Sequence, residues 1–521
     1  MKLSKRQMLQ GSAAALAAIA SPRESGAATM PLTVVLESEV VILDPHATTA
    51  AITRTFAYHV FDTLFSMDSK GLVHPQMVRS FETSADGLVW QFILRDDLVW
   101  HDGAPVKASD CVASLKRWAR GDALGRMLLA ASVAIEVIDE RSFKIALKEP
   151  FPLMLDVLGK PNAPLPVMMP ERILPPPDQR IKEIVGSGPF KFKADAWRPG
   201  NRIVLERFER YKPRSEPPDF LSGAKVVKVD QLILHVMPDD ATAATALMAG
   251  EVDYVQYLPF DWIEKLEQRK GVQIMALTGV DMFQGNFRLN HATGAFVDPA
   301  VREVLWKLVD QAETLHAIGI PPRFAAKDCP AFFMCDAPLT SAEGAESKTL
   351  NLEAAREALK KTGYKGETIV FLEVAGSISQ TAGAVLADKM RKVGFVVDEQ
   401  VMDWGTVLAR RAKKDGWGIF PVYANGIDMT SPLTHFYVAN NCSDYPGWSC
   451  SPLISEKLVA YAKAADPAAR KRIAAEIQVE AYQNTPSVMW GQFCRPAGYR
   501  SRLTNLIQSS FPMFWQVALE S

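Results

Sequence analysis

The side chains that most often do chemistry are present in this chain, but none stands at a spacing that builds a known catalytic geometry. The sequence contains no G-x-x-x-x-G-K-[ST], no G-x-S-x-G and no H-E-x-x-H. These motifs build a phosphate-binding loop, a hydrolase nucleophile and a pair of zinc ligands. We therefore expect no catalytic residue, no bound metal and no cofactor.

The histidines and glycines also form no recognisable catalytic or cofactor-binding motif. The eight histidines are scattered along the chain. His101 lies in Trp100-His101-Asp102-Gly103, a pattern typical of a turn rather than of a ligand set. The stretch 186–188, Gly-Ser-Gly, does not complete a dinucleotide fingerprint. An enzymatic interpretation therefore has no residue to build on.

Charge excludes two classes of partner. The chain has 58 basic and 59 acidic residues, a formal net charge of −1. Proteins that bind nucleic acid or an anionic membrane surface normally carry a basic excess. We expect neither partner. Any ligand must therefore be recognised by a local group of residues and not through the overall charge of the protein.

The N-terminus resembles an export signal. Basic residues at positions 2, 5 and 6 precede the apolar run 13–20, and small residues at 25–28 offer a cleavage site. The run is shorter than the roughly 20 residues that a membrane-spanning helix needs. We expect residues 1–28 to be removed and the protein to be periplasmic. Residues 4–9, Ser-Lys-Arg-Gln-Met-Leu, resemble a twin-arginine signal with lysine in the first position, which leaves the export route open.

Cysteine usage agrees with this compartment. The first of six cysteines is Cys111, so no thiol is available near the cleavage region for lipoprotein anchoring. The mature protein is expected to be soluble. Cys329 with Cys335, and Cys442 with Cys450, are close enough for two small disulfide loops, and free buried thiols are the alternative.

The chain is longer than one core can fill. Its 521 residues exceed the about 250 to 300 of a single core, so at least two lobes are expected. Strand patterns occur at 34–36, 90–95, 202–207 and 229–236. Helix patterns with capping residues occur at 298–319, 351–363 and from 466 to before Pro486. This alternation predicts α/β lobes. Seven prolines in 161–177 predict an ordered surface connection.

Several ordered blocks resemble one known family, the peptide/nickel/opine class of extracellular solute-binding proteins of ABC transporters, family 5. The blocks are 43–45 (LDP), 60–65 (VFDTLF), 80–97 (SFETSADGLVWQFILRDD), 99–106 (VWHDGAPV), 186–190 (GSGPF), 198–200 (RPG), 246–253 (ALMAGEVD), 289–290 with Phe296, Asp298, Val301, Arg302 and Asp310, and 491–493 (GQF). They are spread over nearly all of the exported length. We interpret most of these residues as strand and turn scaffold, not as ligand contacts.

The resemblance implies a two-lobed periplasmic-binding-protein fold of type II, an α/β fold with an extra inserted subdomain and a two-segment hinge. The implied first lobe is discontinuous, with residues 30–65, 185–279 and 488–521. The inserted subdomain takes 66–184, and the second lobe takes 280–487. Closure of such lobes over a ligand requires contacts that the open form lacks.

The function that the resemblance implies is capture of a peptide or other small amine-bearing solute and its delivery to the membrane permease of an ABC importer, by a monomer. One alternative is a metal-chelate or opine-like ligand, with Arg495 and the scattered histidines as contacts. An exported hydrolase and a chaperone are alternatives from other classes.

The resemblance also implies a ligand site. Peptide-binding members hold the ligand ammonium with an aspartate followed four residues later by proline, and Asp428 with Pro432 fits that spacing. A carboxylate in a closed cleft needs a positive partner, which a ligand amine would supply. A turn or cap role for Asp428 is the alternative. Met429, Tyr423 and Trp404 are expected to line the cleft. Dipeptide-binding members hold the ligand carboxylate with an arginine, and no arginine is present near 379–381. The resemblance therefore does not establish a free dipeptide as the ligand.

Overall fold

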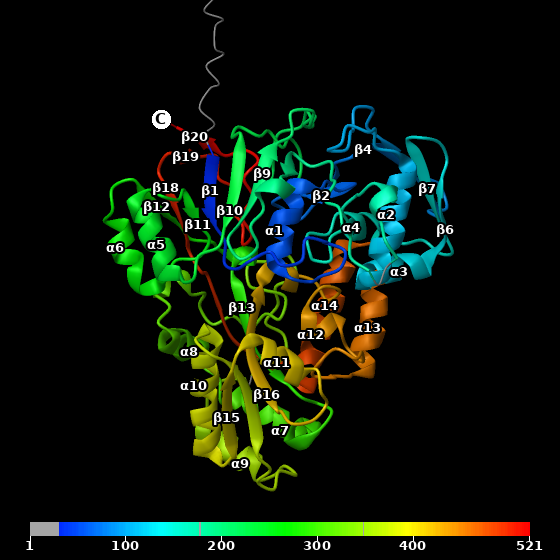
Figure 1. The fold of residues 1–521 in the computed structure, drawn as a ribbon. Helices are drawn as coiled ribbons and strands as arrows, with labels where there is room; N and C mark the ends of the chain where they lie inside the picture. Colours follow the sequence, from blue (N-terminus) through cyan, green and yellow to red (C-terminus); the bar gives the residue numbers. More distant parts are fainter. Residues whose placement is uncertain (1–30, 177–178, 347, 521) are drawn as a thin grey trace, which may run out of the picture.

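The computed structural model describes residues 31–176, 179–346 and 348–520. The predicted export signal therefore lies outside the described residues. Three large sheets organise the molecule, and Figure 1 shows them as three bodies above, below and to the right of the centre. Two small hairpins complete the strands: β2 (Phe65–Met67) with β3 (Val73–Pro75), and β19 (Leu503–Thr504) with β20 (Ala518–Leu519).

The first lobe is built on a seven-stranded sheet. Its strands, in spatial order, are β12 (Val272–Met275), β18 (Ala497–Arg500), β11 (Tyr254–Val255), β1 (Pro31–Val35), β10 (Gln231–His235), β9 (Arg202–Arg207) and β8 (Phe190–Phe192). The helices α1 (Ala51–Val60), α5 (Asp240–Ala249) and α6 (Ile263–Glu267) pack on it. Central β1 runs parallel to both β10 and β11, so the carboxyl ends of these three strands share one edge.

The second lobe is built on a five-stranded sheet. Its strands, in order, are β15 (Val397–Met402), β14 (Ile369–Val374), β16 (Ile419–Asn425), β13 (Phe283–Leu289) and β17 (Ser487–Phe493). Its helices are α7 (Pro299–Val304), α8 (Gln311–Ile318), α9 (Leu352–Leu359), α10 (Ile378–Val393), α11 (Trp404–Arg411), α12 (Phe436–Ala439), α13 (Pro452–Lys463) and α14 (Pro467–Asn484). Strand β16 ends against the first lobe, where the short turn η8 (Gly426–Met429) follows it.

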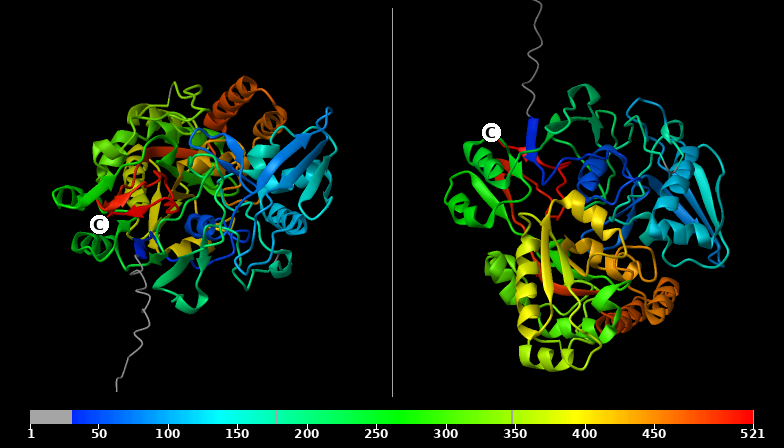
Figure 2. Two further views of the ribbon diagram at one scale, coloured as in Figure 1. Left: turned by 90° about the horizontal axis from the view of Figure 1, so that it is seen from above. Right: turned by 60° about the horizontal axis from the view of Figure 1, so that its bottom comes forward.

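A third body has its own core. Its four-stranded antiparallel sheet has the order β4 (Val78–Thr83), β5 (Val89–Leu94), β7 (Ser142–Leu147) and β6 (Ser132–Val137). Helices α2 (Ala108–Gly121) and α3 (Ala123–Ala131) cover it, and α4 (Met154–Leu158) packs against α3 and β2. A separate hydrophobic cluster centred on Phe92, Trp118 and Phe143 fills this body. Figure 2 shows it beside the first lobe and next to α13 and α14 of the second.

Two segments connect the lobes. The chain leaves the first sheet at the end of β12 and enters the second at β13, and it returns between β17 and β18. The return therefore falls at 494–496, later than the predicted residue 488. The reason is that β17 pairs antiparallel with β13 along its length and all seven of its residues are buried. The other predicted boundaries stay a prediction.

Most predicted elements are confirmed, with two differences. The pattern at 298–319 is two helices, because Asp310 accepts a hydrogen bond from the Glu313 amide and starts α8 anew. The proline-rich stretch is not a surface connection, since Leu165, Val167 and Met169 are fully buried in the main core. Both predicted disulfides, Cys329–Cys335 and Cys442–Cys450, are present.

Candidate functional site

Asp428 lies where the two lobes meet, and its carboxylate already has a protein partner. Its Oδ1 accepts a hydrogen bond from Arg54 Nη1 at 2.8 Å and another from Asn162 Nδ2 at 2.6 Å. Arg54 comes from α1 of the first lobe and is 1% exposed, while Asp428 follows β16 of the second lobe. These three residues, which we call the closure contact, therefore join the second lobe to the rest of the molecule.

The closure contact changes the interpretation of Asp428. From the sequence, a ligand amine was expected to be the positive partner of this carboxylate, whereas in the structure Arg54 is that partner. Arg54 also stacks on the Phe511 ring at 4.1 Å, which fixes its guanidinium. The Asp428 side chain is 12% exposed, and its Oδ2 makes no hydrogen bond to any described residue. The prediction that it also contacts a ligand amine stays a prediction.

The other predicted lining residues occupy different surroundings. Met429 is fully buried and belongs to the main core. Trp404 is 45% exposed at the start of α11, with the Arg411 guanidinium 5.3 Å from its ring. Tyr423, on β16, packs edge-to-face against Phe283 at 5.2 Å and interacts with Arg495. Of the four predicted residues, Asp428 and Tyr423 lie at the junction of the lobes.

A second polar group occupies this junction near the hinge. We call Glu37, Asp240, Tyr257, Tyr423 and Arg495 the Glu37 cluster. Arg495 lies in the returning segment, donates to Asp240 Oδ2 at 2.9 Å and lies 4.1 Å from the Tyr257 ring centre. Glu37 follows β1, and its backbone amide donates to Gln256 Oε1 at 3.0 Å.

The charged and aromatic side chains of the Glu37 cluster influence one another electrostatically. Desolvation by the surrounding protein raises the pKa of Glu37, and Arg495 and Arg54 partly oppose this rise. Desolvation also raises the pKa of Tyr423. The cluster lies at the shared carboxyl edge of β1, β10 and β11, where open α/β sheets commonly bind ligands.

Sequence reasoning missed Arg54, Asn162, Glu37 and Tyr257. Arg54 had a signal, because it is the only arginine, lysine, aspartate or glutamate of α1, and such a charge is rarely buried unless it is paired. Glu37 had none, since an acidic residue after a strand is ordinarily solvated. Only the tertiary arrangement brings it beside Arg495, more than four hundred residues later.

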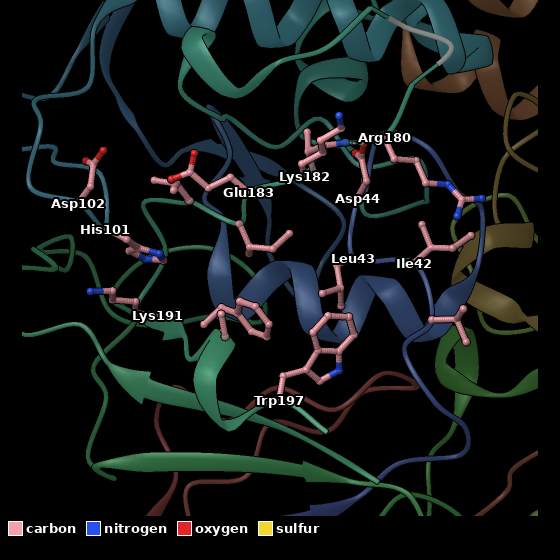
Figure 3. A pocket seen from close by; sticks show the side chains of 16 residues that line it. Ile42, Leu43, Asp44, His101, Asp102, Arg180, Lys182, Glu183, Lys191 and Trp197 are labelled. Atoms are coloured by element: carbon pink, nitrogen blue, oxygen red, sulfur yellow. Dashed lines mark hydrogen bonds between the residues drawn. The ribbon is translucent and has the colours of Figure 1, made fainter. Parts of the chain in front are cut away.

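A separate hollow of about 560 Å³ opens on the first lobe (Figure 3). Two of its polar side chains, those of His101 and Asp44, have structural partners. His101 Nε2 bonds the Gly188 carbonyl at 3.0 Å, and burial lowers the pKa of this imidazole to about 4. Asp44 accepts two hydrogen bonds from Arg117, at 3.1 and 2.7 Å. The hollow therefore lies at the boundary between the first lobe and the third body.

Two structural observations concern membranes and metals. Within the described ranges, no helix has both the length and the apolar character needed to cross a membrane. Among the same residues, no group of three or more His, Cys, Asp or Glu side chains is placed to hold a metal ion.

Known proteins share this chain's sequence and architecture. A family model described as "Bacterial extracellular solute-binding proteins, family 5 Middle" matches residues 73–447. A probable peptide ABC transporter periplasmic-binding protein, y4tO of Sinorhizobium fredii, is 34% identical over 536 residues, covering 99% of both chains.

Solved structures agree in fold. The PBP AgaA in complex with agropinic acid, from A.tumefacien R10, superimposes with a TM-score of 0.75 at 22% identity, covering 94% of this chain and 99% of the other. DppA of Helicobacter pylori in complex with the peptide STSA gives 0.77 at 18% identity, covering 94% and 98%. The predicted two-lobed periplasmic-binding-protein fold is confirmed. The chain belongs to family 5 of the bacterial extracellular solute-binding proteins.

Proposed function

We propose that this protein is the exported substrate-binding component of an ABC importer, and that it captures a peptide or another small amine-bearing solute between its lobes and delivers it to the permease. The observation that carries this proposal is that two polar groups, the closure contact and the Glu37 cluster, each bring side chains of both lobes together. A hinge of two segments permits the lobes to open and close at this junction.

Asp428, Met429, Tyr423 and Trp404 remain the proposed substrate-binding residues from the sequence. The position of Tyr423 beside Arg495 and that of Asp428 at the closure contact support two of them. Met429 packs in the core and thereby helps to shape the site, and the indole ring of Trp404 is exposed on the same lobe.

The mature protein is proposed to be soluble, periplasmic, monomeric and without enzymatic activity. We expect its chain to begin near Met30 after export, because the small residues at 25–28 precede that point. N-terminal sequencing of the protein recovered from the periplasm checks this expectation. A cytoplasmic protein that retains Met1 would contradict it.

The choice of an amine-bearing solute is supported by the relative with 34% identity, which is named as a probable peptide-binding protein.

Retention of peptides tests the proposal. A synthetic mixture of di- and tripeptides without lysine is incubated with protein from which co-purified ligand has been removed, and the bound fraction is separated by gel filtration and identified by mass spectrometry. We expect a defined subset of peptides to be retained at about one per protein molecule. Retention of none of them by folded protein would contradict the proposed peptide ligand.

A further inference from the structure

One arginine at the junction of the lobes retains unused hydrogen-bond donors. Arg495 lies in the returning segment 494–496, between β17 of the second lobe and β18 of the first. Its Nη2 donates to Asp240 Oδ2 at 2.9 Å. Its Nε and Nη1 donate to no residue that the structure describes, although the side chain is only 17% exposed. A guanidinium carries more N–H groups than this one bond uses, so the others are available to a further acceptor.

The first lobe fixes the position of this guanidinium without satisfying it. Asp240 is the first residue of α5, and the Tyr257 ring, whose centre lies 4.1 Å from Arg495 Cζ, belongs to the segment after β11. The contact with the ring uses no N–H group. The Asp240 side chain is 49% exposed, and water screens an ion pair with such a partner. The guanidinium is therefore held in place and can still bind a second anion.

The second lobe contributes aromatic rings to the same place. Phe283 on β13 packs against Tyr257 at 5.7 Å and against Tyr423 of β16 at 5.2 Å. The Tyr423 ring also packs against Phe493, two residues before Arg495, at 5.7 Å. Tyr257, Phe283 and Phe493 are buried. An anion bound to Arg495 would lie beside rings from both lobes, which shield it from water and strengthen its attraction to the arginine.

A second donor accompanies the guanidinium. Tyr257 is 5% exposed, and its hydroxyl makes no hydrogen bond to any residue in the described ranges. Polar groups of buried side chains are normally hydrogen-bonded. A phenol hydroxyl can donate to a carboxylate oxygen, so an anion next to Arg495 would satisfy both side chains.

The other cations near the junction already have buried carboxylate partners. Arg54 is paired with Asp428, and Lys160 is paired with Asp122. A ligand carboxylate would have to break one of these pairs to reach either cation, which leaves a buried carboxylate without its partner. Arg495 can bind the same carboxylate while it keeps its contact with Asp240.

We infer that Arg495 is the receptor for the carboxylate of the ligand, with the Tyr257 hydroxyl as a second donor. This inference rests on the proposed capture of a peptide between the lobes, and it assigns recognition of the free C-terminal carboxylate to the hinge side of the junction. A guanidinium suits this task because it can donate to both oxygens of a carboxylate. Arg495 thereby supplies, from a different segment, the arginine that is absent near 379–381.

The test compares di- and tripeptides without lysine, aspartate or glutamate, as free acids and as C-terminal amides. Retention at increasing peptide concentration gives the apparent affinity for each form. Wild type is expected to bind the free acids on the order of 30-fold or more tightly than the amides, as for a charge pair shielded from water. Arg495→Gln removes the charge, so its affinity for the free acids should fall to that for the amides, and its affinity for the amides should stay at the wild-type level.

Two further variants show whether the effect comes from carboxylate recognition. Arg323→Gln is the matched control, because Arg323 also pairs with a carboxylate, that of Glu267, and lies over a ring, that of Phe324, but is 51% exposed. It should discriminate as wild type does. Asp240→Asn removes the partner that ties Arg495 to α5. If Arg495 binds the ligand carboxylate, this variant should still prefer the free acids.

The outcomes separate this inference from the proposed function. If wild type retains neither form, peptide capture fails and the inference fails with it. If wild type binds both forms equally, or Arg495→Gln keeps the wild-type preference, peptide capture stands and the role of Arg495 is overturned. Equal loss of preference in Asp240→Asn, or a parallel loss of both forms in Arg495→Gln, would show that Arg495 only supports the hinge, and would overturn the inference as well. Circular dichroism confirms that each variant is folded.

Discussion

At the scale of single residues, the closure contact shows what a sequence pattern can and cannot predict. The Asp-x-x-x-Pro spacing led to Asp428, and the structure places this residue at the junction of the lobes. The spacing contained no information about its partner, because Arg54 lies 374 residues earlier. A buried ion pair depends on tertiary packing, and a single sequence does not reveal such a pairing.

Asp428→Asn should weaken ligand binding by roughly 100-fold or more, because it leaves the buried Arg54 guanidinium without its carboxylate in the closed form. Quantitative retention of the peptide mixture measures this loss. The control is Asp403→Asn at the exposed start of α11. Unchanged binding in Asp428→Asn would contradict a closing role for the pair.

At the scale of elements, the sequence predicted strands and helices well where local signals agree. The start of α14 at Asp466-Pro467 and the end of α8 at Gly319 follow from capping chemistry. The break within 298–319 was missed because the apolar spacing continues through it. The place of β17 in the second lobe was missed because its pairing with β13, which is distant in sequence, is not a local property.

One buried carboxyl group makes the packing of α10 on β14 dependent on pH. Glu373 on β14 is buried, its Oε1 has no hydrogen bond, and α10 passes directly over it at Gly383. Desolvation by burial, with a further contribution from Glu399, raises its pKa from 4.5 to about 7, while Arg391 lowers it. The folded state thus keeps a proton that the unfolded state has released.

Stability should therefore fall as pH rises from 4.5 to about 7, by roughly 3 kcal/mol from this group. Glu373→Gln should remove this part of the pH dependence and raise the urea midpoint at pH 8. Glu353→Gln on the exposed side of α9 serves as the control and should leave both unchanged. Equal pH dependence in wild type and Glu373→Gln would show that this carboxyl is not responsible.

At the scale of the whole molecule, the family resemblance supplied what local patterns could not: two lobes, an inserted body and a two-segment hinge. Several contacts hold the second lobe against the rest of the molecule. Besides the closure contact, Lys463 on α13 approaches Glu149 of the third body at 3.1 Å, and both side chains are exposed. Such a contact at the rim exists only while the second lobe lies against the rest of the protein.

Crosslinking this rim contact tests capture between the lobes most directly. Glu149→Cys with Lys463→Cys places two exposed thiols there, while Cys111 and Cys494 are buried and the remaining native cysteines are in disulfides. Each single-cysteine variant, treated with the same bismaleimide, is the control. We predict that protein crosslinked before exposure to the peptide mixture takes up no peptide, and that protein crosslinked afterwards keeps its peptide through gel filtration. Uptake and release that are unaffected by the crosslink would contradict binding between the lobes.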